Sequence, residues 1–329
     1  MHVIHAAAVE DLRWDLQGAV LGMGTLDGVH LGHQAILRRV VAQAAASGST
    51  PAVLTFAQHP LEVVRPERAP SLITPLPLKL ALLERLGMAA AVVIHFTPEL
   101  AALEAREFVE RALVDGLKVR GLCVGYDFGF GRGRQGNVAL LQTLGERHGL
   151  WVEVVAPVTV LGEVVSSRLI RSLLAEGRME EAQGFLGRPY CLSGDVEPGV
   201  GRGRSLGFAT ANLPPPALLR DGVYAGRVLV RGNYWNAMMN LGRAPTFGPG
   251  VHRLEVHIPG WDSALYGERI LVFVLRRLRD EESFADDGAL RAQLARDRET
   301  AEAVWRAAEA LPWPEWSLHV LSLNDIDSR

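Results

Sequence analysis

Residues 24–33 read GTLDGVHLGH, and they stand between an apolar run at 18–23 and a helix-like stretch that begins at Gln34. One buried face of that helix is predicted by the spacing of Ile36, Leu37, Val40, Val41 and Ala44. The sequence therefore predicts a strand, a glycine-rich turn and a helix in succession. Main-chain N–H groups at a helix start attract anions, and glycines let a ligand approach the backbone closely. We expect a phosphate-binding turn at this place.

The rest of the first half continues the same alternation. Strand-like runs occupy 52–57, 90–96, 121–127 and 151–158, and helix-like runs occupy 75–87, 105–116 and 137–149. This order over about 150 residues predicts a parallel sheet with helices on both faces, a Rossmann-like α/β domain. Ligands of such sheets bind beyond the carboxyl ends of the strands. Both 24–33 and 125–137 are expected at that edge.

The pattern changes near residue 185. Short β runs punctuated by glycine follow at 190–199, 222–232, 233–242, 252–260 and 269–279. Their spacing predicts a small antiparallel barrel or sandwich, and a charged helix is expected at about 285–309. We therefore predict an α/β domain at 1–185 and an all-β domain with a C-terminal helix at 186–329.

Composition excludes several classes of protein. The chain has 329 residues, and its net charge of −3 gives no basic footprint for nucleic acid. No apolar run approaches the roughly 20 residues that span a bilayer, and the N-terminus lacks the pattern of a signal peptide. Cys123 and Cys191 are far apart and predict neither a disulfide framework nor a cysteine metal site. We expect a soluble, cytoplasmic protein without nucleic-acid or membrane partners.

The HxGH pattern places His30 and His33 about one helical turn apart at the helix start. At that position, imidazoles can donate hydrogen bonds to phosphate oxygens as charge builds during nucleotidyl transfer. A zinc site is less favoured than a catalytic pair, because the HExxH pattern is absent and no third ligand is obvious nearby. The alternative is that Asp27 and the glycines only form a turn, with both histidines exposed.

A second candidate for phosphate binding is VVSSRLIR at 164–171. Ser166 and Ser167 open a predicted helix, and Arg168 and Arg171 project from its first turns. Hydroxyl, N–H and guanidinium groups together suit a triphosphate. The alternative is a simple helix cap. Because the P-loop pattern is absent, phosphates are not expected to bind in the Walker manner.

The glycine-rich segment 199–207, followed by Thr210 and Asn212, is a third candidate. Two residues apart on a strand, these side chains share a face, and their oxygens suit Mg²⁺ accompanying a nucleotide. The alternative is a flexible hairpin. Glu255 lies in an otherwise apolar strand, either exposed to solvent or positioned as a base for a hydroxyl that attacks a phosphate. The charge run at 276–284 is expected on the surface.

The ordered set of motifs resembles the bacterial bifunctional riboflavin kinase/FMN adenylyltransferase family. The first half matches in GxxDGVHxGH at 24–33, TFAQHP at 55–60, VGYDFGFG at 124–131 and SSxxIR at 166–171. The second half matches in LGRPY at 186–190, RGRSLGFATAN at 202–212, DGVYAG at 221–226, LGRAPTF at 241–247, LEVHI at 254–258, LYG at 265–267 and LRDEESF at 278–284. Each motif is weak alone, but the ordered set is specific.

The resemblance implies two ATP-dependent reactions, with flavins as substrates and products. A six-stranded barrel kinase would phosphorylate riboflavin to FMN, with Glu255 as base and with Thr210 and Asn212 holding Mg²⁺. Its nucleotide would also contact Gly201, Arg202, Gly203, Arg204 and Gly207. The N-terminal module would adenylylate FMN to FAD. There, the nucleotide-binding set would be Gly24, Asp27, His30, His33, Asp127, Ser166, Ser167 and Arg171.

The chain departs from the family pattern at several positions. It has Leu26 where phenylalanine is common, Gly129 where arginine is common and Arg168 where threonine is common, as well as Ala209 and Ala244. The changes at 129 and 168 lie in the adenylyltransferase module and move positive charge locally. Two alternatives to a bifunctional enzyme remain: a protein with one working activity, or a flavin-binding regulator without turnover. Oligomeric state is left open.

Overall fold

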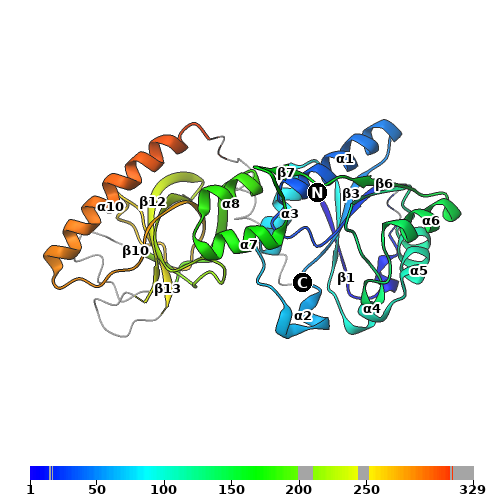
Figure 1. Ribbon diagram of the computed structural model, residues 1–329, viewed down its shortest axis with the longest axis horizontal. Helices are drawn as coiled ribbons and strands as arrows, with labels where there is room; N and C mark the ends of the chain where they lie inside the picture. The colour runs from blue at the N-terminus through cyan, green and yellow to red at the C-terminus, as the bar shows by residue number, and fades with distance from the viewer. Residues whose placement is uncertain (15, 17, 199–209, 244–251, 312, 314–329) are drawn as a thin grey trace. The chain divides into compact units, whose positions relative to one another are not determined.

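The computed structural model describes residues 1–329 except 15, 17, 199–209, 244–251, 312 and 314–329. The chain forms two compact units, residues 1–167 and 168–329, which are described separately (Figure 1). In the described part of the chain, no helix is both long and apolar enough to cross a membrane.

The first unit is built on a six-stranded parallel sheet, as predicted. Its strands run in the order β1 (His2–Ala6), β4 (Ala90–Ile94), β3 (Pro51–Phe56), β2 (Val20–Met23), β5 (Gly121–Gly125) and β6 (Trp151–Val155). The chain proceeds outward from β2 to β3 and β4, and then crosses to β5 on the other side of β2. Ligands bind at such a reversal of strand order. The turn at 24–33 and the loop after β5 therefore leave the sheet side by side.

Helices cover both faces of this sheet. On one face, α1 (Leu31–Ser47) packs against β2, β3 and β5. Gly22 permits this contact, because a Cβ there would lie 3.0 Å from a Val40 methyl group. On the opposite face, Leu21 and Met23 share a core with η1 (Val9–Leu12), the π-helix η3 (Phe108–Gly116) and α6 (Val138–His148).

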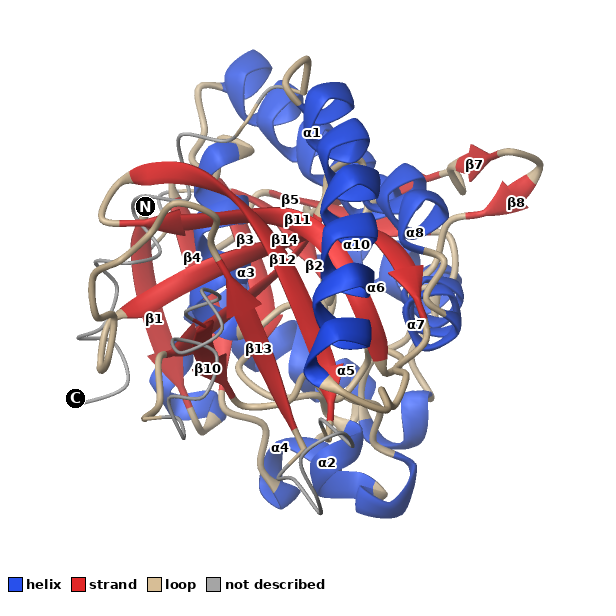
Figure 2. Cartoon of the chain, turned by 90° about the vertical axis from the view of Figure 1, so that its left-hand side faces the viewer, coloured by secondary structure: helices blue, strands red, loops and turns tan. Residues whose placement is uncertain are grey.

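The remaining elements of the first unit are short, apart from α3. They are α2 (Leu61–Val64), η2 (Pro66–Arg68), α3 (Leu76–Arg85), α4 (Pro98–Ala102), α5 (Ala105–Glu107), η4 (Arg132–Arg134), β7 (Thr159–Val160) and β8 (Glu163–Val164). Figure 2 shows β7 and β8 as a small hairpin outside the larger sheets. The edge strand β1 was not anticipated from the sequence.

The second unit begins with α7 (Ser167–Glu176) and α8 (Met179–Leu186) and continues into a six-stranded antiparallel sheet. The strand order is β10 (Thr210–Leu213), β13 (Arg253–His257), β12 (Asn233–Gly242), β11 (Gly222–Val230), β14 (Arg269–Arg279) and β9 (Tyr190–Asp195). A bridge between Glu197 and Asn212 joins the chain after β9 to β10 at the opposite end of this order. The predicted antiparallel barrel architecture is thereby confirmed.

The C-terminal helix α10 (Asp287–Ala308) packs along this sheet (Figure 1). Ala301, Val304 and Trp305 of the helix form a core cluster with Met238 of β12 and Leu275 of β14. Met238 and Asn240 are two residues apart and share a face of β12. The helix therefore covers the face of the sheet on which the candidate kinase residues lie.

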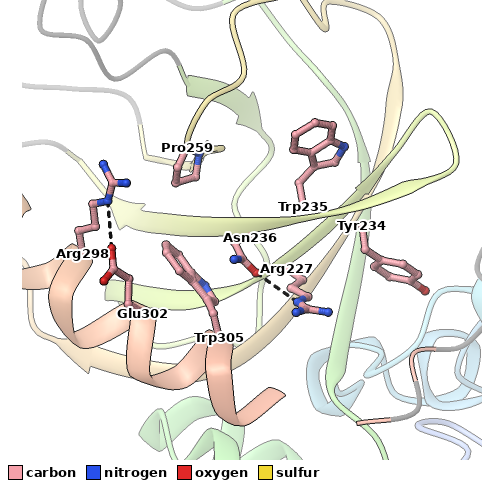
Figure 3. Close-up of a pocket in the computed structure, with 8 residues that line it drawn as sticks. All are labelled: Arg227, Tyr234, Trp235, Asn236, Pro259, Arg298, Glu302 and Trp305. Atoms are coloured by element: carbon pink, nitrogen blue, oxygen red, sulfur yellow. Dashed lines mark hydrogen bonds and ion pairs between the residues drawn. The ribbon is translucent and has the colours of Figure 1, made fainter. Parts of the chain in front are cut away.

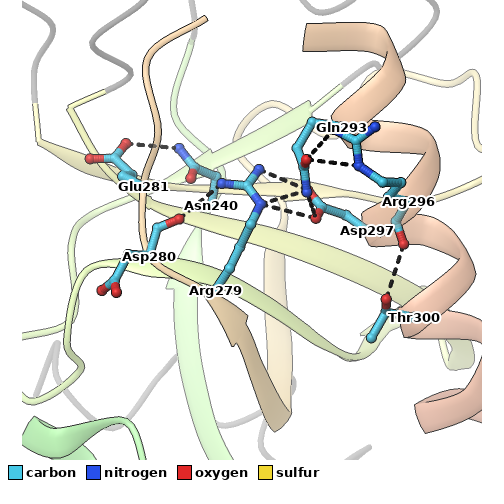
Figure 4. Close-up of polar contacts among 8 residues, drawn as sticks. All are labelled: Asn240, Arg279, Asp280, Glu281, Gln293, Arg296, Asp297 and Thr300. Atoms are coloured by element: carbon cyan, nitrogen blue, oxygen red, sulfur yellow. Dashed lines mark hydrogen bonds and ion pairs between the residues drawn. The ribbon is translucent and has the colours of Figure 1, made fainter. Parts of the chain in front are cut away.

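A buried ion pair ties α10 to the end of β14 (Figure 4). The Arg279 guanidinium donates to both oxygens of Asp297, whose side chain is only 4% exposed. Gln293 donates to the same carboxylate. The surface position expected for 276–284 is wrong for Arg277 and Arg279, whose side chains are 14% and 16% exposed. Partners on distant elements make their burial possible.

Asp297→Asn is expected to lower the free energy of unfolding by about 3 kcal/mol, because it leaves the Arg279 charge buried without a counter-charge. Urea unfolding followed by tryptophan fluorescence measures this, since five of the seven tryptophans lie beyond residue 167. Asp195→Asn removes a similar two-pronged pair with Arg269 from an exposed site and should cost at most about 1 kcal/mol. If the two substitutions lower the free energy of unfolding equally, burial does not set the contribution of the Arg279–Asp297 pair, and the prediction is wrong.

Candidate active sites

The turn at 24–33 has an unusual backbone. Leu26 and Val29 adopt positive φ angles of 49° and 41°, which are rare for branched side chains, and Gly28 adopts 88°. Both branched side chains are fully buried, and the Val29 amide donates to the Leu26 carbonyl at 3.1 Å. Strained residues held by surrounding structure are typical of ligand sites. The conformation of the turn is therefore fixed by its packing.

Asp27 anchors this turn to a neighbouring segment. Its carboxylate accepts hydrogen bonds from the main-chain N–H groups of Ile73 and Thr74, and it is 2% exposed. The Ser167 hydroxyl donates to the Asp27 carbonyl at 2.8 Å. Both residues were predicted to bind nucleotide; the contacts here give them a further role, which is to hold the turn.

His30 and His33 form a stacked pair at the start of α1. Their ring centroids are 3.6 Å apart, with planes inclined by 17°. His30 is the N-cap residue, and its Nδ1 accepts from the His33 main-chain N–H at 3.3 Å. A neutral His30 consequently carries its proton on Nε2, where it can be donated. The interpretation of both histidines as merely exposed is wrong, because His30 is 5% exposed.

Gly32 explains the spacing of the HxGH pattern. A Cβ at this position would lie 3.1 Å from the His30 ring and 3.7 Å from the Val165 carbonyl oxygen. A side chain would therefore press against the imidazole stack. The glycine serves close packing here, in addition to any approach of ligand.

Polar burial in the described residues is concentrated at this turn. Among all the described residues, seven polar or charged ones are buried, and five of these belong to the turn or contact it: Asp27, His30, Thr55, Thr74 and Lys79. Thr55 Oγ1 donates to the Thr25 carbonyl at 2.9 Å, and Lys79 Nζ reaches the same carbonyl at 3.3 Å. Lys79 was missed from the sequence, because its position in an apolar helix gave no functional signal.

The loop after β5 carries Asp127, which is exposed. Arg134 donates to the Asp127 carbonyl at 3.2 Å, and its guanidinium lies over Gly129. A Cβ at Gly129 would lie 2.9 Å from Arg134 Nη2. The Arg134 guanidinium therefore lies beside the Gly129 backbone.

In the second unit, strand register brings the candidate kinase residues together. Asn212 of β10 stands opposite Glu255 of β13, and Glu255 stands opposite Asn240 of β12. Thr210 lies two residues before Asn212 and therefore shares its face. Asn212 is 6% exposed, and Arg253 donates to its Oδ1 at 3.5 Å. Hydroxyl, amide and carboxylate oxygens thus gather on three adjacent strands.

The Glu255 carboxyl is partly desolvated. Burial raises its pKa above the ordinary value, the nearby Arg253 charge lowers it, and the Glu281 carboxylate raises it further. Glu281 accepts from Asn240 Nδ2 at 3.3 Å (Figure 4). It also accepts from the Arg243 main-chain N–H at 3.3 Å. Gly242 makes room for it, because a Cβ there would lie 2.0 Å from the Glu281 carboxyl carbon. Glu281 was missed, since it lies in a charge run expected on the surface.

The same unit contains a cavity of about 450 Å³ beside α10 (Figure 3). It is lined by Arg227, Tyr234, Trp235, Asn236, Pro259, Arg298, Glu302 and Trp305. Its polar side chains are partly paired with each other, Arg227 with Asn236 and Arg298 with Glu302. Thr210, Asn212 and Glu255 are not part of its lining. The grouping of the candidate kinase residues therefore rests on strand register and not on this cavity.

Some predicted site residues are not brought into either group. Gly201, Arg202, Gly203, Arg204 and Gly207 lie outside the described residues, as do Ala209 and Ala244. Arg171 is half-buried on α7, within the second compact unit. Gly24, by contrast, directly follows β2 and begins the turn at 24–33, and its N–H donates to the Leu54 carbonyl of β3.

Comparisons with known proteins find a match for each half of the chain. A family model described as FAD synthetase matches residues 12–169, and another described as riboflavin kinase matches residues 186–305. A bifunctional riboflavin kinase/FMN adenylyltransferase from Escherichia coli (strain K12) is 36% identical, over 87% of this chain and 92% of that protein. The chain belongs to the bifunctional riboflavin kinase/FMN adenylyltransferase family. A family member of the same name from Bacillus subtilis (strain 168) is 33% identical, over 86% of this chain and 91% of that protein.

Among solved structures, one described as a macrolide-efflux protein from Streptococcus pneumoniae matches both halves of this family member. Its TM-score is 0.80 at 27% identity, over 92% of this chain and 99% of that chain. Its description applies to that protein. The similarity supports the fold of both modules, and the kinase and nucleotidyltransferase assignment rests on the family matches.

Proposed function

We propose that this chain converts riboflavin to FMN in residues 186–329 and FMN to FAD in residues 1–185, consuming one ATP in each reaction. Family membership over most of the chain supports both reactions. The observation that carries the proposal is that each compact unit holds its own polar constellation. These are the buried histidine turn in the first unit and the Asn212–Glu255–Asn240 row in the second.

In the kinase reaction, Glu255 takes the proton from riboflavin's terminal ribityl hydroxyl. That oxygen attacks the γ-phosphate of ATP, the bond from the γ-phosphorus to the bridging oxygen breaks, and ADP leaves. A base needs a pKa nearer the working pH than an ordinary carboxyl has, and partial burial supplies a shift in that direction. Asn212 and Thr210 hold the phosphates beside this base. Asn240 and Glu281 position the neighbouring main chain.

Mg²⁺ fits the donor set of the kinase site. Thr210 and Asn212 offer hard oxygens on one face, with the Glu255 carboxylate on the adjacent strand. Mg²⁺ needs only one or two protein ligands when phosphates and water complete its shell. When bound, it would neutralise phosphate charge.

In the adenylyltransferase reaction, the FMN phosphate attacks the α-phosphate of ATP, and pyrophosphate leaves. His30 and His33 donate hydrogen bonds to phosphate oxygens as negative charge accumulates. Gly24 and the helix start provide close main-chain approach, and Asp127, Ser166, Ser167 and Arg171 are kept as nucleotide contacts. No covalent enzyme intermediate is needed, so positioning and charge stabilisation supply the rate.

We place the protein in the cytoplasm, with small-molecule substrates and no nucleic-acid partner. The sequence also allows two alternatives to a bifunctional enzyme. One is a chain with a single working activity, and the other is a flavin-binding regulator without turnover. The retained base and histidine pair favour catalysis, because binding alone does not require them.

Chromatography of the products from purified protein, riboflavin, ATP and Mg²⁺ tests the proposal. FMN is expected to rise first and then to fall as FAD accumulates, and omission of Mg²⁺ should suppress both products. Accumulation of FMN without FAD would show that only the kinase is active. FAD formed from added FMN but not from riboflavin would leave only the transferase, and flavin binding without product would identify a regulator.

A further inference from the structure

Lys79 places a buried positive charge beneath the turn at 24–33. Its side chain comes from α3 and is 2% exposed. Nζ donates to the Phe56 carbonyl at 2.6 Å and to the Thr25 carbonyl at 3.3 Å. It therefore connects the end of β3 to the turn that follows β2.

The residue type is itself informative. The chain has 34 basic residues, and only Lys79 and Lys118 among them are lysines. A compact ammonium can donate to two carbonyls within a closed space, whereas a planar guanidinium needs more room and presents a fixed fork. In a chain that otherwise uses arginine, the cation beneath this turn is a lysine.

This burial is energetically unfavourable. Desolvation lowers the pKa of Lys79 to about 8, and the Asp27 carboxylate acts against that shift. Its hydrogen-bond partners are neutral carbonyls, and Asp27 uses its own oxygens on main-chain N–H groups. A neutral side chain would avoid the cost of a buried charge. The charge is therefore expected to have a use.

We propose that Lys79 is a positioning residue for adenylyl transfer, which holds the peptide between Thr25 and Leu26 in the orientation that binds phosphate. The proposal rests on the adenylyltransferase function assigned above. In a trans peptide, the C=O and the following N–H point in opposite directions. Lys79 and Thr55 both donate to the Thr25 carbonyl, so the Leu26 N–H is directed away from these two side chains, to the side on which we place the phosphate.

The charge of Lys79 also acts on the ligand directly. ATP and FMN bring several negative charges to the turn, and a fixed cation in a low-dielectric interior favours their approach. The titratable groups nearby are few. Asp27, His30 and His33 belong to the turn, whereas β3 contributes the Thr55 hydroxyl and the Phe56 carbonyl.

Lys79→Met is expected to lower kcat/KM for FAD formation from FMN by about a hundredfold, the scale of a misplaced binding group. FMN formation from riboflavin in the same preparation should be unchanged. Thr55→Val is the matched variant, because it removes the other donor to the Thr25 carbonyl but no charge; its loss should be smaller, about tenfold or less.

The pH profile separates positioning from a simple structural role. Lys79 is charged below about pH 8 and neutral above it, so wild-type kcat/KM for FAD formation should fall as pH rises through that value. Lys79→Met should lack this limb, and Lys79→Arg, which stays charged, should lack it too. If Lys79→Met does not fold, the wild-type profile still tests the proposal, because a level profile would overturn it.

Retained activity in Lys79→Met would overturn the proposal, as would a wild-type profile that stays level from pH 7 to about 9.5. An identical falling limb in all variants would assign the titration to another group and overturn it as well. A wild-type protein that forms no FAD at all would instead refute the function on which the proposal rests.

Discussion

Glu255→Gln is expected to abolish formation of FMN from riboflavin while added FMN is still converted to FAD. Glutamine keeps the size of the side chain but cannot accept the hydroxyl proton. General-base catalysis contributes about 10²–10⁴-fold, so kcat for the kinase should fall by at least the lower figure. Glu255 stands opposite Asn212 and Asn240 on the neighbouring strands, and neither of these side chains carries a carboxylate that could replace it. Chromatographic assays begun separately from riboflavin and from FMN measure the two rates.

Glu268→Gln is the matched control for this substitution. Glu268 is a carboxylate of the same unit that pairs with Arg231, and both kinase and transferase rates should stay at the wild-type level. Simultaneous loss of both activities in Glu255→Gln would count against separate modules. FMN formation at the wild-type rate would remove Glu255 from its assigned role.

The pH dependence of the kinase follows from the same group. Because only the ionised carboxylate accepts a proton, the rate should fall as pH decreases through the raised pKa of Glu255. The effect on stability has the opposite sign. A raised carboxyl pKa means that the folded state binds the proton more tightly, so Glu255 favours folding at low pH and disfavours it as pH rises. Glu255→Gln should therefore unfold at an equal or higher urea concentration at neutral pH.

Local patterns were sufficient to predict the layers of the first unit and the turn at 24–33. Apolar runs predicted β2, β3, β4 and β5, and the strand-to-helix junction predicted the turn, where an anion site stays a prediction. The edge strand β1 was missed because HVIHA is short and carries two histidines, and because its partner β4 begins 88 residues later. Pairing across that distance leaves no signal in a local window.

The supporting residues of both sites were missed for a related reason. Lys79 is 54 residues from the Thr25 carbonyl that it contacts, and Glu281 is 38 residues from the Arg243 amide. Each looks like an ordinary charged residue in its own segment. Their burial is created by the meeting of distant elements, so only the folded arrangement identifies them.

The double variant His30→Ala/His33→Ala is expected to reduce FAD formation by at least about a thousandfold while leaving FMN formation intact. Loss of a single preorganised donor typically costs about 10²–10³ in kcat, and here two stacked donors are removed at a helix start. Rates from FMN and from riboflavin, measured on one preparation, give the comparison.

Two further variants separate chemistry from folding. Since His30 also caps α1, its removal destabilises the helix by about 1 kcal/mol. His30→Asn keeps an acceptor for the His33 amide, so it should preserve the unfolding midpoint and still lose FAD formation. His5→Ala/His95→Ala removes another contacting pair, whose nitrogens are 2.8 Å apart on β1 and just after β4, and should leave both activities unchanged. Full FAD synthesis by His30→Asn would show that the cap, and not the imidazole, is what adenylyl transfer requires.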